Sequence, residues 1–207
     1  MKKIKIFSSI MLLVSLVSCK KEPTPEVTNQ DETIAVSSFL NINLGNHNNV
    51  DFGSFINLRT GEVYHLSIDA KAFDNQSKVD LVYYYNNINH TDPFIGAPTT
   101  AGSNNATGGI FDNNPYGINF WTTVNNTEFG LANDISVGDF NSIQNLAELK
   151  SKWGTVSVGL HYEYNVLSDK IYRFKTTDNK IGLLKINSIV GSGQTIGTMN
   201  VDVKIQK

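Results

Sequence analysis

The sequence predicts a mainly β protein, with an antiparallel, sandwich-like single domain that carries one or two short helices. Apolar residues alternate with polar ones early in the domain, an aromatic and β-branched run lies near residue 80, and strand-like segments separated by turn sequences fill the last third. Asparagine tolerates turn conformations and competes with regular backbone pairing. The chain has 25 asparagines, and we place loops where they are paired: Asn48-Asn49, Asn86-Asn87, Asn104-Asn105, Asn113-Asn114 and Asn125-Asn126.

Residues 1–18 have the features of a lipoprotein signal peptide. Met1 to Lys5 is short and positively charged, and Ile6 to Val17 is uncharged and too short for a comfortable membrane span. The following Leu16-Val17-Ser18-Cys19 resembles the lipobox of bacterial lipoproteins, in which the cysteine thiol receives a diacylglyceryl group. Cys19 is the only cysteine, so no internal disulfide can form, and we predict that it carries the lipid. The alternative is an uncleaved anchor with an incidental cysteine.

Composition divides the rest of the chain into a tether and a domain. Residues 19–33 contain two prolines, several charges and one aliphatic side chain, Val27, so we expect a flexible lipidated tether. Residues 34–207 are long enough for one β-rich domain with a sizeable core. Loss of the signal peptide leaves 14 basic and 19 acidic residues, which argues against nucleic acid as a partner.

The first half of the domain predicts three strands. Five apolar residues lie at even positions of a first segment, which is typical of a strand: Ile34, Val36, Leu40, Ile42 and Leu44. Phe52 to Leu58 forms a second candidate, followed by a turn at Arg59 to Glu62. The run from Val79 to Tyr85 predicts a strand with both faces covered. A short helix over Ser67 to Phe73, with Ser67 as N-cap, is expected just before it.

The second half predicts a long loop, a helix and a meander. Residues 86–119 are rich in Gly, Pro, Asn and Thr, and long loops of this kind are often functional. A helix capped by Asp139 is expected up to Trp153, because apolar residues recur there at helical spacing, with Gly154 ending it. Strands are then predicted at Ile171–Thr176, Ile181–Val190 and Thr195–Gln206, joined by turns at Asp178-Asn179 and Gly191–Gln194.

A search for catalytic and metal-binding motifs gives little. The sequence contains no His-Glu-x-x-His, Gly-x-Ser-x-Gly or Walker motif, so we predict that the protein is not an enzyme. Asp112 to Gly117 resembles the start of a calcium loop, but Thr123 stands where a bidentate glutamate is required. No metal site is therefore predicted.

Two histidines lie near tyrosines. His90 follows the aromatic strand that contains Tyr83 and Tyr85, and His161 precedes a Tyr-Glu-Tyr sequence. An imidazole nitrogen is a good axial ligand for haem iron, and aromatic rings suit the face of a macrocycle. We name these four side chains as the candidate ligand-binding residues. The alternative is that both histidines are ordinary loop residues and that the tyrosines pack on the sheet.

Several segments together resemble a known group of proteins. Gly53–Tyr64, Lys78–Tyr85, Tyr172–Ile186 and Val201–Ile205 are similar to segments of largely uncharacterised Bacteroidota outer-membrane lipoproteins and, more distantly, of HmuY-like haem-binding lipoproteins. The resemblance covers about residues 53–85 and 170–206. It implies a mainly β fold, attachment to the outer membrane and, in some members, haem bound by two histidines, although neither histidine here aligns with those ligands.

These observations give the functional expectation. We expect a non-catalytic lipoprotein, anchored in the outer membrane through lipid on Cys19 and exposed at the cell surface, that acts as a binding module with haem as the named ligand. The alternative is a structural or adhesive surface protein without a small-molecule ligand.

Lipid attachment has a direct test. Cys19→Ser removes the thiol that forms the thioether, so the variant should incorporate no labelled fatty acid and should leave the membrane fraction. Metabolic labelling with palmitate, beside the wild-type chain, measures this. Labelled Cys19→Ser protein would contradict the lipobox interpretation.

Overall fold

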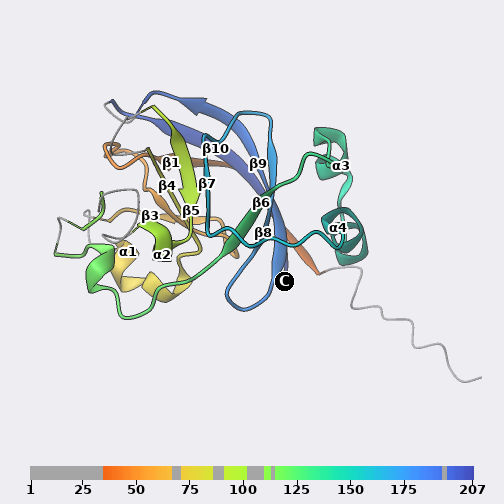
Figure 1. Cartoon of the computed structure of the whole chain (residues 1–207), viewed down its shortest axis with the longest axis horizontal. Helices are drawn as coiled ribbons and strands as arrows, with labels where there is room; N and C mark the ends of the chain where they lie inside the picture. Colours follow the sequence, from red (N-terminus) through yellow and green to blue (C-terminus); the bar gives the residue numbers. More distant parts are fainter. Residues whose placement is uncertain (1–34, 67–70, 86–90, 102–109, 113–114, 193–194) are drawn as a thin grey trace, which may run out of the picture.

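Two five-stranded antiparallel sheets form the centre of the residues that the computed structural model describes, which are 35–66, 71–85, 91–101, 110–112, 115–192 and 195–207 (Figure 1). Sheet A has the order β1 (Val36–Gly45), β10 (Thr198–Gln206), β9 (Ile181–Val190), β8 (Ile171–Lys175) and β6 (Glu128–Leu131). Sheet B has the order β3 (Glu62–Tyr64), β2 (Phe55–Asn57), β4 (Leu81–Tyr85), β5 (Pro93–Gly96) and β7 (Tyr162–Tyr164). The predicted mainly β, antiparallel fold is confirmed.

The main core lies between the sheets. Strand β10 contributes one fully buried side chain at every second position, as its sequence alternation predicted: Met199, Val201, Val203 and Ile205. Sheet B faces them with Ile56, Tyr83 and Ile95, among others. Burial of such side chains, at about 25 cal/mol per Å² of apolar surface, is the main favourable contribution to folding. The two sheets therefore form one domain.

Short helices cover the outer faces of both sheets. Helices α3 (Val137–Ser142) and α4 (Leu146–Trp153) pack on sheet A, while α1 (Lys71–Asp74), α2 (Pro98–Ala101) and the 3-10 turns η2 (Gln76–Lys78) and η3 (Ile118–Phe120) lie at the other end of the molecule (Figure 1). Ala72, Ala101 and Ile118 pack there on the outer face of sheet B. None of the described helices is long and apolar enough to cross a membrane.

Strand β1 departs from simple alternation at a bulge. Its pairing with β10 shifts between Phe39 and Ile42, and Asn41 takes a left-handed conformation with φ of 57°. The backbone N–H of Asn41 donates to Asp202 Oδ1 at 2.8 Å. The extra residue moves Phe39 against the inter-sheet core and leaves Leu40 exposed, while Val36 packs on the opposite face, with α3 and α4. The even positions of this strand therefore do not share one buried face.

The predicted helix after residue 139 is two helices. Ser136 caps α3 by accepting from the backbone of Asp139, whose own side chain returns a capping-box contact, so Asp139 is not the N-cap. Asn145 caps α4 through Glu148, and Gly154 ends that helix with φ of 68°, as predicted. The apolar periodicity continues from Phe140 to Trp153, but the cap at Asn145 starts a second helix. The helix is therefore interrupted where the sequence pattern is not.

The region from 86 to 119 is more regular than expected. Strand β5 and helix α2 lie inside it, and both contribute buried residues. The predicted helix before β4 is present as α1, whereas its proposed cap, Ser67, lies outside the described residues. Strand β5 is too short for an alternation of apolar and polar residues to be recognised in the sequence. Its pairing with β4 is therefore seen only in the structure.

Two buried asparagines hold loops together: Asn46, and Asn49 from one of the pairs that were interpreted as loop markers. The amide of Asn46 donates to the carbonyls of Ser192 and Thr195, each at 2.9 Å. The amide of Asn49 donates to Gly197 O at 3.0 Å, and its oxygen accepts from backbone N–H groups that follow it. These side-chain amides supply hydrogen-bond donors to backbone carbonyls of the β9–β10 connection. They thereby join this connection to the loop after β1.

We predict that Asn46→Ala destabilises the protein by about 2 kcal/mol, because the substitution removes a buried amide that donates two hydrogen bonds to the β9–β10 connection. Urea denaturation measures the change. The matched control is Asn133→Ala at an exposed asparagine, which should change the free energy of unfolding by less than about 0.5 kcal/mol. Equal effects of the two substitutions would contradict the bridging role.

Candidate functional site

The structure places Tyr83 and Tyr85 inside the sandwich. Both side chains belong to the core between the sheets, with ring centroids 5.8 Å apart. Tyr85 Oη donates to the carbonyl of Gly191 at 3.1 Å. Burial raises the pKa of the Tyr83 hydroxyl far above its ordinary value. These two side chains are packed as core residues, which matches the alternative that the sequence left open for them.

His161 lies at the seam between the two sheets, just before β7. Its Nδ1 is 3.3 Å from Thr127 O, and its Nε2 is 3.3 Å from Nδ2 of Asn126. A neutral ring with its hydrogen on Nδ1 satisfies both contacts. The structure therefore does not bring His161 together with Tyr83 and Tyr85. His90 and Cys19 lie outside the described residues.

The exposed side chains of the β7 segment form what we call the tyrosine stripe: Leu160, Tyr162 and Tyr164. Tyr162 and Tyr164 share one face of β7, and Leu160 lies two residues before that strand, on the other side of a bend at His161. The exposed fractions of Leu160, Tyr162 and Tyr164 are 56%, 41% and 65%. Leu160 is held by a bridge to Phe129 of sheet A, whose backbone N–H donates to Leu160 O at 2.6 Å. The stripe is thus a fixed part of the β framework that faces solvent.

An aromatic ladder supports the stripe from below. Tyr84 of β4 stacks on Phe94 of β5, with centroids 5.3 Å apart and planes 18° apart. Phe94 in turn contacts the rings of Tyr162 and Tyr164, each with a centroid distance of 6.2 Å. Tyr84 and Phe94 are buried, so the ladder runs from the core to the exposed edge of sheet B. Aromatic pairs of this kind add about 1 kcal/mol each beyond area burial.

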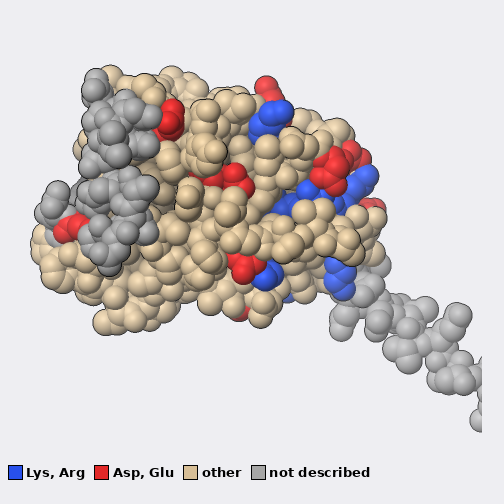
Figure 2. All heavy atoms as spheres, viewed as in Figure 1, with Lys and Arg blue, Asp and Glu red and all other residues tan. Residues whose placement is uncertain are grey.

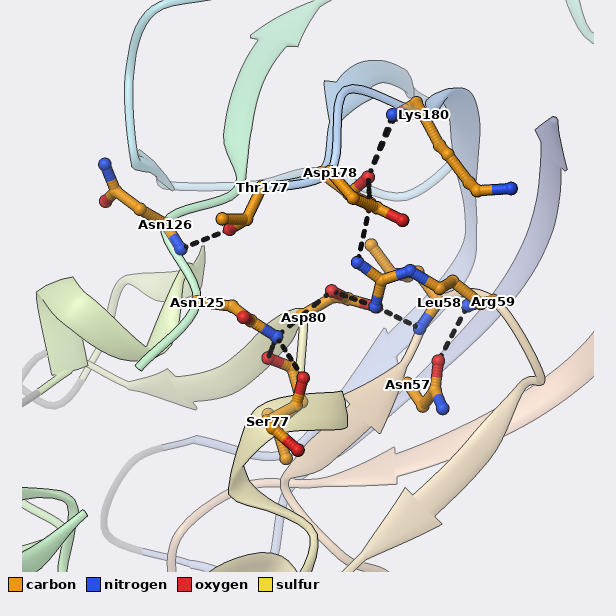
Figure 3. A network of polar contacts seen from close by, with 12 residues as sticks. Asn57, Leu58, Arg59, Ser77, Asp80, Asn125, Asn126, Thr177, Asp178 and Lys180 are labelled. Carbon is orange, nitrogen blue, oxygen red and sulfur yellow. Dashed lines mark hydrogen bonds and ion pairs between the residues drawn. The ribbon is translucent and has the colours of Figure 1, made fainter. Parts of the chain in front are cut away.

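A buried polar network, which we call the Asp80 clamp, joins the two sheets (Figure 3). Asp80, Arg59 and Asp178 form it. Nη1 of Arg59 contacts both oxygens of Asp80, at 2.7 and 2.8 Å, and Nη2 donates to Asp178 Oδ1 at 2.7 Å. The backbone N–H of Leu58 adds a bond to Asp80 at 3.1 Å. Arg59 follows β2, and Asp178 lies in the turn between β8 and β9, so the clamp spans both sheets.

The clamp continues toward the stripe through two asparagines. The amide of Asn125 donates to the carbonyls of Ser77 and Val79, next to Asp80. The backbone N–H of Asn126 donates to Thr177 Oγ1 at 2.8 Å (Figure 3). Because the side chain of Asn126 also contacts His161, the clamp fixes the segment that borders β7.

Asp80 has the most perturbed carboxyl of the clamp. Burial raises its pKa to about 6, and the opposing effects of the Arg59 guanidinium and the Leu58 N–H are smaller. Its side chain is fully buried, so it has no access to a ligand. Hydrogen bonds from Arg59 and Thr176 lower the pKa of Asp178, against the effect of burial. The arrangement serves to hold the fold.

Sequence reasoning missed the clamp, although a signal was present. A carboxylate at the start of an apolar, β-branched strand needs a buried cationic partner. The turn that precedes β4 in the chain offers Arg59, one of two arginines in the protein. The exposure of Tyr162 and Tyr164 had no such signal, because it depends on β7 being the edge strand of sheet B.

The described residues contain no group of three or more His, Cys, Asp or Glu side chains placed to hold a metal ion.

Comparisons with known proteins give a fold likeness. No family model matches the chain, and no curated protein matches it. A solved structure does: the crystal structure of a DUF4466 family protein from Parabacteroides merdae, with a TM-score of 0.51 and 16% sequence identity. The match covers 83% of this chain and 54% of that protein, so the chain spans about half its length. At this identity the likeness concerns the fold alone.

The raised pKa of Asp80 predicts a pH dependence. Between about pH 4 and pH 6 the folded chain keeps a proton on Asp80 that the unfolded chain has lost, so this group's contribution to stability falls as pH rises. Asp80→Asn removes that contribution. The free energy of unfolding of the variant should therefore rise more steeply with pH, or fall less steeply, than that of the wild type across this window.

Urea denaturation at several pH values measures the difference. Asp134, Asp139 and Asp202, whose pKa values are lowered by contacts outside the clamp, contribute equally to both proteins and cancel. Parallel pH profiles would show that Asp80 titrates alike in the folded and unfolded chains and would contradict the prediction.

Proposed function

We propose that this chain is a non-catalytic lipoprotein of the outer membrane, exposed at the cell surface, which binds a ligand on the tyrosine stripe. The observation that carries the proposal is the pair of tyrosine side chains exposed at alternate positions of β7, with the exposed Leu160 two residues before that strand. Single exposed apolar residues are common on protein surfaces, whereas a contiguous group on a rigid element marks an interaction site.

The rigidity of the stripe favours binding over a merely exposed surface. Its rings rest on Phe94, which is stacked on the buried Tyr84, and its strand is hydrogen-bonded to β5. The tyrosine side chains have little conformational freedom left to lose when a ligand contacts them. Such preorganisation favours affinity because the ordering cost of binding is reduced.

Three polar side chains of the described residues, Asp80, Arg59 and His161, are committed to the fold. Asp80 is fully buried, and Arg59 donates to two carboxylates. His161 contacts Thr127 and Asn126 through its two ring nitrogens. A general base must reach the proton that it abstracts, and these side chains are held by other partners. This supports a binding role rather than catalysis.

The point of attachment fits display of the domain. The described chain starts at Ala35, whose carbonyl accepts from the backbone N–H of Lys207 at 2.8 Å. This end of the molecule lies near α3 and α4, opposite α1 and α2 (Figure 1). A tether from Cys19 would therefore join the domain at its α3–α4 end and leave the opposite end free of the attachment.

The proposal predicts binding that depends on the stripe. The probes are haem, neutral oligosaccharides and unstructured peptides, added to the mature chain with serine in place of Cys19. Haem is included because of the resemblance to HmuY-like lipoproteins and because His161 adjoins the stripe. At least one probe should raise the melting temperature of this protein, since a ligand that binds only the folded state stabilises it.

The same probe should not raise the melting temperature of the double variant Tyr162→Ala, Tyr164→Ala. His161→Ala, with a Soret titration, tests haem ligation separately. A panel without any effect would favour the structural or adhesive alternative. A stabilisation that is equal in the double variant would place the binding surface elsewhere and overturn the proposal.

A further inference from the structure

The tyrosine rings of the stripe each offer one face to a ligand. Tyr164 is paired directly with Phe94 across the strands, and Tyr162 is paired with Gly96. Both rings incline by less than 40° to the ring of Phe94, at 30° for Tyr162 and 39° for Tyr164. One side of each ring therefore rests against the ladder. Because β7 is the edge strand of sheet B, the other side faces solvent.

The spacing of the rings gives two stacking positions in a row. Alternate residues of a strand lie about 7 Å apart and point the same way. Two aromatic faces at this spacing suit neighbouring units of an extended chain better than a single compact molecule.

Neutral polar groups surround the rings. Residues 154–167 contain no lysine or arginine, and their one charged side chain is Glu163. Glu163 alternates with the two tyrosines and is half-buried on the opposite face, where it accepts from the backbone of Leu131. Next to Tyr162 lies Thr100, and next to Tyr164 in the chain lies the exposed Asn165.

Most charged side chains of the face in Figure 2 lie away from β7, although acidic atoms are also present at the centre of that face, where Figure 1 draws β7. On the face that Figure 2 shows, most of the blue and red atoms lie over the half of the molecule that carries α3 and α4. Anionic ligands such as phosphates or nucleic acid require clustered Lys and Arg, which the stripe segment lacks. The stripe segment therefore offers an anionic ligand no Lys or Arg of its own, and this favours a neutral ligand.

We infer that the tyrosine stripe binds a neutral oligosaccharide chain, an inference that rests on the proposed function and names its ligand class. The flat C–H faces of successive sugar rings would stack on Tyr162 and Tyr164. The sugar hydroxyls at the ring edges would bond to the tyrosine hydroxyls, Thr100 and Asn165. Amphipathic rings of this kind match tyrosine, which joins an apolar face to a polar tip.

Isothermal titration calorimetry on the mature chain, with serine in place of Cys19, tests the inference. The probes are the neutral hexasaccharides of cellulose, laminarin and mannan, together with the acidic hexamer of galacturonic acid. At least one neutral chain should bind, and the acidic chain should bind more weakly. Tyr162→Ala and Tyr164→Ala should each weaken binding by about tenfold, in line with the loss of one stacked ring.

Two further variants distinguish stacking from an effect on folding. Tyr164→Phe keeps the ring and should retain most of the affinity. Phe120→Ala removes an exposed aromatic side chain of η3, away from β7, and should leave binding unchanged. Melting temperatures of all variants establish that they are folded.

The outcomes separate the two proposals. If no neutral chain binds while haem or a peptide binds in a stripe-dependent manner, the carbohydrate inference is overturned and the proposed function stands. Stronger binding of the acidic chain, or equal losses in Phe120→Ala and Tyr164→Ala, would also overturn the inference. If no probe of any class depends on the stripe, both proposals fail.

Discussion

The buried carboxylate of Asp80 lies where three segments from different parts of the chain meet. Arg59 follows β2, Leu58 donates its backbone N–H, and the same arginine reaches Asp178 between β8 and β9. A buried carboxylate is costly unless it is paired and hydrogen-bonded, so the turn and the hairpin can occupy only positions that keep these contacts. The clamp therefore fixes how the two sheets are aligned, which the nondirectional packing of the core alone leaves less well defined.

The alignment of the sheets has a consequence at the far edge of sheet B. Strands β4 and β5 are buried, and their ladder of Tyr84 and Phe94 ends under β7, which is short and exposed. The seam beside β7 is closed by the bridge between Phe129 and Leu160. An edge strand that exposes tyrosines on such a fixed base has the properties of a preformed binding surface.

Strands were predicted correctly from the sequence where the burial of their side chains leaves a local pattern of apolar residues. The alternation on β10 and the aromatic run of β4 both depend on local pattern, and both strands were predicted. Sequence reasoning failed where a single residue changes the pattern: the left-handed Asn41 shifts β1 by one residue, and the Asn145 cap divides a helix. A helix cap contributes about 1 kcal/mol to stability. The pattern of apolar residues does not show such a contribution, so it does not locate the cap or the bulge.

The candidate site was predicted only in part, for a related reason. The segment from His161 to Tyr164 was singled out for its histidine, with the tyrosines as neighbours. In the structure the tyrosines face solvent and the imidazole contacts Thr127 and Asn126. Which residues of a three-residue strand face outward depends on the partner strand and on the position in the sheet. Both are set by contacts distant in sequence, such as the pairing of β7 with β5.

The central claim is that a rigid, outward-facing tyrosine stripe binds the ligand while the interior tyrosines do not. An NMR titration of the mature, unlipidated chain with a neutral hexasaccharide, observed through labelled tyrosine rings, tests this most directly. The account predicts that the resonances of Tyr162 and Tyr164 shift with saturation, whereas those of Tyr83 and Tyr85 stay in place. Shifts confined to Tyr83 and Tyr85, or spread evenly over all tyrosines, would contradict it.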